Sequence, residues 1–226
     1  MPLVANEHAA PADLPYRRDH KVLYPFQELA VSRLARQQSA AFVYRPWNGA
    51  LTMALAASRS HVETAPQVQR VVVLTEPTLG EDCRTQIEAF TAPENIMSRV
   101  GSVGQRWRTY ATTPAQWLIV SLGVLSSDVD ALLPLMPTSL LVIAPSVGLI
   151  ERNLKRSQAA TLLSRAAAQR LVALSPAFNY GADDWEHLMS LAFGPDTAAY
   201  RRVTRDTLAR IRHCGNNYLL TITQQD

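Results

Sequence analysis

Short apolar runs, separated by stretches of helical character, constrain the fold of this chain more than any other feature of its sequence. Each run is about five residues long and rich in β-branched residues, as buried strands usually are. The runs are Ala40–Tyr44, Val71–Thr75, Trp117–Leu122, Leu140–Ala144 and Arg170–Leu174. The helical stretches between and after them are Gly49–Ser60, Gly80–Phe90, Leu125–Leu133, Ser157–Ala168 and Asp183–Leu191. Strands that alternate with helices predict an α/β fold, a doubly wound parallel sheet whose strands are buried on both faces.

The two ends of the chain differ from this pattern. Residues 1–20 are polar with three prolines, which predicts a flexible N-terminal arm. A helix is expected over Pro25–Gln38, with Pro25 in its first turn. Near the C-terminus, Tyr200–His213 reads as a basic helix and Tyr218–Thr223 as a strand. We therefore expect an arm over 1–20, a single lobe over 21–199, and a basic helix with a terminal strand over 200–226.

Composition excludes several classes of protein. With 226 residues, 47% of them hydrophobic and 18% charged, the chain can bury one sizeable core and is not expected to be disordered. A net charge of +3 permits contact with nucleic acid without requiring it. The two cysteines, Cys83 and Cys214, lack metal-ligand spacing and read as idle thiols. No membrane helix or signal peptide is recognisable, so we expect a cytoplasmic protein, or a nuclear one in a eukaryote.

Several segments, in a fixed order, resemble the motifs of Swi/Snf-type helicase ATPases. Tyr24-Pro25-Phe26-Gln27 resembles the segment whose glutamine reads adenine, and Asn48-Gly49-Ala50-Leu51-Thr52 stands where that family has Gly-x-Gly-Lys-Thr. The other matching segments are Pro77–Phe90, Trp117–Leu125, Leu140–Val147, Asn153–Ala159, Arg170–Ala177, Asp184–Met189 and Gly194-Pro195. The resemblance spans residues 22–200 and implies one RecA-like lobe. An active motor of this class needs two lobes, because ATP binds between them, and we recognise no second lobe here.

The residues that would perform the chemistry of this family are replaced. A phosphate loop needs a lysine to neutralise charge, but Leu51 occupies its position. Ala144 and Pro145 stand where the family has the aspartate that holds magnesium and the glutamate that activates water. Gln27, Gly49 and Thr52 match the family; Thr52 either contacts a metal or simply begins a helix. We expect a vestigial nucleotide site, no ATPase activity and no cofactor.

No other reactive constellation is apparent in the sequence. The five histidines do not cluster, and no serine lies in the context of a nucleophile elbow. Asp183-Asp184 fits the cap of a helix, Glu151 fits a solvated surface, and Asp128 and Asp130 fit the solvated face of a helix. We therefore predict no catalytic residue and no metal site.

Basic and aromatic residues interleave at two places that could contact nucleic acid. The predicted contacts are Arg106, Trp107, Arg108, Ser121, Arg201 and Arg205. Ser121 is included because the resemblance places it near the nucleic-acid track. The alternative is a solvated basic face without a ligand, since charge runs are usually surface.

A protein partner is the second expected kind of contact. Trp47 lies where the family has a small residue, and an exposed aromatic there would mark an interface, whereas a buried one would belong to the core. The favoured function is a catalytically inactive helicase-like subunit or scaffold in a nucleic-acid-processing assembly, bound to another protein. The alternatives are an accessory protein that binds DNA or RNA by itself, and a lobe completed by a second polypeptide.

Overall fold

A computed structural model describes residues 23–43, 49–89, 91–98, 101–144, 147–149, 151, 154–174, 182–194 and 220–223. The strands are β1 Ser39–Val43, β2 Arg70–Thr75, β3 Ile96–Ser98, β4 Trp117–Ser121, β5 Ser139–Ile143, β6 Gln169–Leu174 and β7 Leu220–Thr223. The helices are α1 Pro25–Leu34, α2 Ala50–Thr64, α3 Gly80–Glu88, α4 Val103–Thr112, α5 Leu125–Leu132, α6 Lys155–Ala166 and α7 Ala182–Phe193. Short 3₁₀ turns connect several of them, among them Leu133–Thr138 before β5 and Val147–Leu149 after it.

The seven strands form one sheet in the order β3-β4-β2-β5-β6-β1-β7. Strands β1 to β6 run parallel, as predicted, and each of the five predicted strands lies within one residue of its expected bounds. The predicted terminal strand is present as β7, but it runs antiparallel to β1, with Val43 opposite Leu220. The sheet is thus a doubly wound parallel sheet with one antiparallel edge strand.

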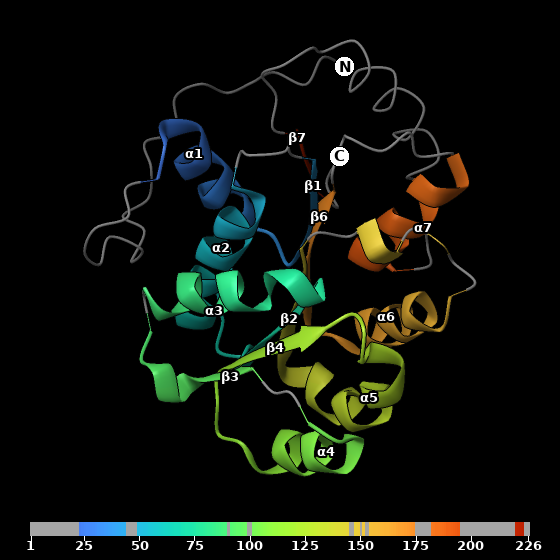
Figure 1. Ribbon diagram of the computed structural model, residues 1–226. Helices are drawn as coiled ribbons and strands as arrows, with labels where there is room; N and C mark the ends of the chain where they lie inside the picture. Colours follow the sequence, from blue (N-terminus) through green and yellow to red (C-terminus); the bar gives the residue numbers. More distant parts are fainter. Residues whose placement is uncertain are drawn as a thin grey trace.

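The helices cover both faces of the sheet (Figure 1). Side chains of α1, α2 and α3 pack on one face, and side chains of α4 to α7 pack on the other. Two elements were not predicted, the short edge strand β3 and the helix α4 that follows it. The helix predicted over Pro25–Gln38 ends at Leu34, and the one predicted over Gly49–Ser60 extends to Thr64.

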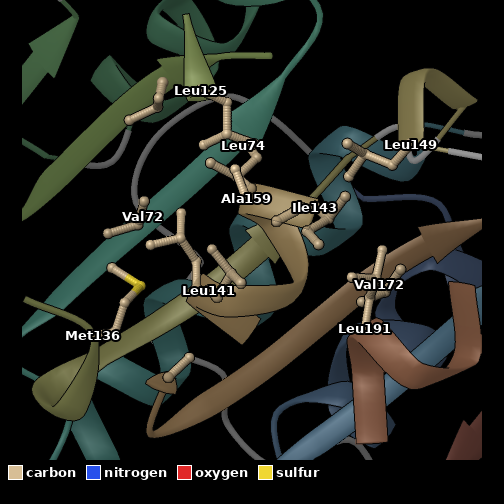
Figure 2. Close-up of a cluster of buried hydrophobic side chains, with 14 of the residues drawn as sticks. Val72, Leu74, Leu125, Met136, Leu141, Ile143, Leu149, Ala159, Val172 and Leu191 are labelled. Atoms are coloured by element: carbon tan, nitrogen blue, oxygen red, sulfur yellow. The ribbon is translucent and has the colours of Figure 1, made fainter. Parts of the chain in front are cut away.

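Alternate residues of the central strands face opposite layers of the core. On β2, Val72 and Leu74 join the cluster under α5 and α6, whereas Val71 and Val73 join the cluster under α2. Figure 2 shows the first cluster, in which Leu74 and Ile143 lie near Leu125 of α5 and Ala159 of α6. Full burial on both sides explains why these strands read as continuous apolar runs.

The structure also answers two questions that the composition raised. Cys83 is buried within α3, as expected for an idle thiol, and Cys214 lies outside the described residues. Among the described residues, no helix combines the length and the apolar character that crossing a membrane requires.

Candidate functional site: the carboxyl edge of the sheet

The carboxyl ends of the parallel strands meet at one edge of the sheet, where ligands bind in open α/β folds. Residues that were predicted to form a vestigial nucleotide site lie at this edge. Leu51 and Thr52 begin α2 after β1, and Ala144 directly follows β5. Pro145 and Trp47 lie outside the described residues, so their predicted roles stay predictions.

Gln27 joins α1 to the beginning of α2. Its carboxamide oxygen accepts a hydrogen bond from the backbone N–H of Tyr24 (3.0 Å), which closes the first turn of α1. The nitrogen of the same carboxamide lies so close to Gly49 that a Cβ there would stand 2.6 Å from it. Gly49 also has φ +73°, a left-handed conformation that favours glycine. The structure therefore brings together Gln27 and Gly49, two of the residues predicted for the nucleotide site.

The first turn of α2, residues 50–53, contains no cationic side chain that could bind a phosphate. Leu51 is half-buried, and its side chain packs against the apolar cluster under α2. The hydroxyl of Thr52 donates a hydrogen bond to the carboxamide oxygen of Gln86 on α3 (2.7 Å). Of the two readings of Thr52, the structure therefore favours a helix-start residue that bridges two helices. Sequence reasoning did not assign Gln86 any part in this site.

Ala144, which the resemblance aligns with a magnesium-binding acid, is almost fully buried. Its backbone N–H donates to the carbonyl of Leu74 (3.1 Å), which extends the pairing of β5 with β2 by one bond. A methyl group cannot ligate a metal or accept a proton. Within the described residues, no group of three or more histidine, cysteine or acidic side chains could hold a metal ion.

The neighbouring strand end contains an acid that sequence reasoning did not single out. Glu76 follows β2, and its carboxylate lies against Gly148 of the turn after β5, so closely that any Cβ at Gly148 would collide with it. The carbonyl of Gly148 accepts a hydrogen bond from Nε of Arg156 at the start of α6. Glu76 and Arg156 therefore both lie against the same turn.

Ser121, at the end of β4, also lies at this edge. Ser121 ends β4 and is half-buried, and its hydroxyl accepts a hydrogen bond from the backbone N–H of Gly123 (3.1 Å). This bond shapes the turn into α5. Glu151 is exposed, in agreement with the prediction of a solvated surface residue.

A second group of predicted residues lies away from the edge, on α4, and there one prediction was wrong. Arg106 is buried, and its guanidinium donates from Nε and Nη2 to the two carboxylate oxygens of Asp128 on α5 (2.6 and 2.7 Å). Its Nη1 donates to the carbonyl of Gly101. A guanidinium held in this way is not available to a phosphate, so Arg106 is not a nucleic-acid contact.

Asp128 is the centre of this buried network, which corrects its prediction as part of a solvated face. It is fully buried and accepts a further hydrogen bond from the hydroxyl of Tyr110 (2.8 Å). Burial by itself would raise the pKa of Asp128, but hydrogen bonds from Arg106, Tyr110 and Ser127 outweigh it, and the pKa lies below its usual value. The carboxylate therefore stays ionised inside the protein. Asp130, by contrast, is exposed, as predicted.

Trp107 and Arg108 remain on the outside of α4. The indole N–H of Trp107 donates to the carbonyl of Ser127 (3.1 Å), yet 39% of the residue stays exposed. Arg108 is exposed as well. Arg201 and Arg205, the other two predicted basic contacts, lie outside the described residues, as does the predicted helix Tyr200–His213.

The fold has known counterparts among solved structures. A Sulfolobus solfataricus SWI2/SNF2 ATPase core in complex with dsDNA superimposes with a TM-score of 0.65 over 87% of this chain and 41% of that one, at 13% identity. The chain has a RecA-like fold. A Pyrococcus furiosus Hef helicase domain gives a TM-score of 0.58 over 74% of this chain and 36% of that one, at 14% identity. The chain thus spans less than half of either structure, as one RecA-like lobe.

At the level of sequence, no known protein family and no curated protein matches the chain.

Proposed function

We propose that this RecA-like lobe is catalytically silent and serves as a non-catalytic subunit or scaffold in a nucleic-acid-processing assembly. The observation that carries the proposal is the first turn of α2. There Leu51 packs into the core instead of presenting a charge, and the hydroxyl of Thr52 is bonded to Gln86. ATP hydrolysis needs a cation for the phosphates, which Leu51 cannot supply. It also needs acids for magnesium and water, and the methyl group of Ala144 can take neither of these roles.

The setting in nucleic-acid processing is supported by the shape of the lobe. The two similar structures are a SWI2/SNF2 ATPase core with dsDNA and a helicase domain, and fold alone does not transfer their activities to this chain. A lobe that keeps its sheet but lacks catalytic groups can still present a binding surface to other molecules. A lobe supplied by another polypeptide would not restore hydrolysis at this site, because Leu51 and Ala144 belong to this lobe.

Nucleotide binding is the first test. We expect no rise in melting temperature with Mg-ATP and no phosphate release with or without DNA. The matched variant Leu51→Lys restores a cation at the same position, and its response separates loss of the lysine from loss of the whole site. A magnesium-dependent ATP shift in the unmodified protein would overturn the proposal.

The partner is the second test. Affinity capture from the native cells, with nuclease treatment, should recover a nucleic-acid-processing protein at a fixed ratio to this one. Recovery of this protein alone, under conditions that preserve complexes, counts against a scaffold role.

Direct nucleic-acid binding is the second candidate function, favoured by the exposed Trp107 and Arg108. A salt-dependent mobility shift with DNA or RNA supports it, and replacement of Arg108, Arg201 and Arg205 by alanine should then weaken binding to all sequences alike. Absence of binding at low salt excludes it.

A further inference from the structure

The side chain of Trp107 is exposed but held in one position. Its N–H is satisfied by the carbonyl of Ser127, the residue that precedes Asp128 on α5. Arg106 and Tyr110, its neighbours on α4, bind Asp128 itself, and Arg106 also donates from Nη2 to the hydroxyl of Ser127 (3.1 Å). Because both helices are fixed by these bonds, the indole ring is preorganised and loses little conformational entropy when a ligand contacts it.

The surface around the ring is small and open. Gly104 lies one turn before Trp107 on the same side of α4, and Ala111 lies one turn after it. A Cβ at Gly104 would meet no described atom within 4 Å outside the adjacent helix backbone, so the surface one turn before the ring is open. Val103, which is 42% exposed, extends the apolar surface by one side chain. We call Val103, Gly104, Trp107, Arg108 and Ala111 the α4 platform.

The charge of the α4 platform suits an anion. The sequence of α4, VGQRWRTYAT, contains no acidic residue. The charge of Arg106 is balanced by Asp128, whereas Arg108 is exposed beside Trp107, and the structure gives it no ion pair among the described residues. A flat aromatic ring next to a solvated guanidinium is the combination that binds the bases and phosphates of single strands.

The size of the α4 platform favours a nucleobase over a protein. A stable protein interface buries on the order of 800 Å² on each partner, and hot-spot residues lie at its centre within a ring of further contacts. The exposed apolar surface here consists mainly of one indole ring and one valine side chain. A single base covers such a ring fully.

We propose that Trp107 is a stacking platform for a base of single-stranded nucleic acid, and that Arg108 contacts an adjacent phosphate. The inference rests on the proposed setting in nucleic-acid processing and assigns a binding residue within it. A base of an intact duplex is already stacked on its neighbours, so the α4 platform should prefer a single strand.

Three end-labelled probes test the proposal by fluorescence anisotropy: a 20-nucleotide thymidine strand, an abasic strand of equal length, and a 20-base-pair duplex. The thymidine and abasic strands have the same phosphates, so their difference in affinity measures base contact. One stacked base should make the thymidine strand bind roughly 5- to 150-fold more tightly. Equal affinity for these two strands, or no binding of the thymidine strand at low salt, overturns the proposal.

Four variants locate the contact. Trp107→Ala should remove the preference for the thymidine strand, and Trp107→Phe, which keeps a ring, should retain part of it. Gly104→Leu places a side chain in the open space one turn before the ring and should weaken binding without harming the helix. Arg108→Gln should weaken the thymidine and abasic strands alike. Leu162→Ala and Arg165→Gln, exposed positions on α6, are the matched controls and should change nothing.

The outcomes separate this proposal from the proposed function. Unchanged binding of the thymidine strand by both Trp107→Ala and Gly104→Leu overturns the α4 platform, while the Mg-ATP and partner experiments still decide the function. If Trp107→Ala abolishes binding of a protein partner but leaves binding of the thymidine strand unchanged, the surface is a protein contact and the proposal is wrong. Melting curves for each variant test whether unfolding causes any loss of binding. Trp107→Phe and Gly104→Leu leave the buried network of Arg106, Tyr110 and Asp128 unchanged, so we expect both variants to remain folded.

Discussion

Arg106 and Asp128 form a two-point ion pair inside the protein, although 22 residues separate them in the sequence. The pair joins the middle of α4 to the first half of α5. Because Asp128 also accepts from Tyr110, a single carboxylate holds two side chains of the neighbouring helix. Burial of a charged pair is favourable only when its hydrogen bonds are made, so this contact fixes how α4 lies on α5.

Replacement of Asp128 by alanine should lower the free energy of unfolding by about 3–5 kcal/mol, because Arg106 would be left as an uncompensated buried charge. The measurement is urea denaturation of the full chain. The triple variant Arg106→Met, Tyr110→Phe, Asp128→Leu removes both charges and the tyrosine hydroxyl together and should recover most of the loss. Glu88→Ala breaks the exposed pair of Glu88 with Arg84 and serves as the control, with an expected cost below about 1 kcal/mol. A cost equally small for Asp128→Ala would contradict the prediction.

Stability should fall as the pH drops from 7 through 6, and His61 should account for part of the fall. Burial lowers the pKa of His61 below its usual 6.5, and the hydrogen bond to the carbonyl of Leu34 offsets only part of this effect. Below pH 6.5 the His61 side chain binds a proton in the unfolded chain but not in the folded one, so the free energy of unfolding falls. This fall ends once the pH is below the folded pKa. His61→Gln, which can still donate to Leu34, should flatten this part of the curve. An identical pH profile for the variant would refute the assignment.

Gly49→Ala should destabilise the protein for two separable reasons. Alanine at φ +73° costs roughly 1–2 kcal/mol in the left-handed region, and its Cβ would press on the carboxamide of Gln27. Shortening Gln27 to alanine in the same chain removes the second effect and leaves the first. In denaturation curves the double variant should therefore lose less than the sum of the two single losses. Strict additivity would mean that Gln27 and Gly49 do not contact each other.

The thiol of Cys83 should resist alkylation in the native protein. Burial raises its pKa to about 12, so almost no thiolate forms near neutral pH. In a Cys214→Ser background, the rate of modification at pH 8 should follow the rate of unfolding and rise sharply in urea. Rapid modification of the folded protein would mean that α3 opens far more readily than its packing suggests.

The sheet could be predicted from sequence because its strands are buried on both faces. Short apolar runs such as Val71–Thr75 are typical of buried strands. Their alternation with helical stretches predicted that the strands pair in parallel. The antiparallel direction of β7 was not predicted. A four-residue strand carries no signal for its direction, which depends on how the chain approaches β1.

Helix α4 was missed for a physical reason. Helix prediction relies on an apolar stripe, but the buried side of α4 consists of Arg106 and Tyr110, both bonded to Asp128. The same reason made Asp128 look solvated. A usable signal was present, because Ser102 and Gln105 form a capping box in which each side chain bonds to the other's backbone N–H.

In the candidate site, too, some features could be predicted from sequence and others could not. Replacements at single positions, such as Leu51 and Ala144, could be proposed from sequence because the resemblance implies a particular chemical group at each position. Contacts between distant segments were not readable. The hydrogen bond from Thr52 to Gln86 spans 34 residues, and nothing in either local sequence indicates it. The loss of catalytic groups stays a prediction from sequence, and the structure adds the contacts that hold the edge together.

The position of β1 between β6 and β7 has a consequence for synthesis on the ribosome. Ser39 pairs with Arg170, which follows it by 131 residues. At a synthesis rate of 5–20 residues per second, β1 waits roughly 7 to 26 s for its first neighbour. Strands β2 to β5 pair with one another earlier, so one half of the sheet can assemble first. During that interval the apolar residues of β1 have neither of their two strand neighbours, so the edge that β5 presents to β6 and both edges of β1 stay unpaired until β6 emerges.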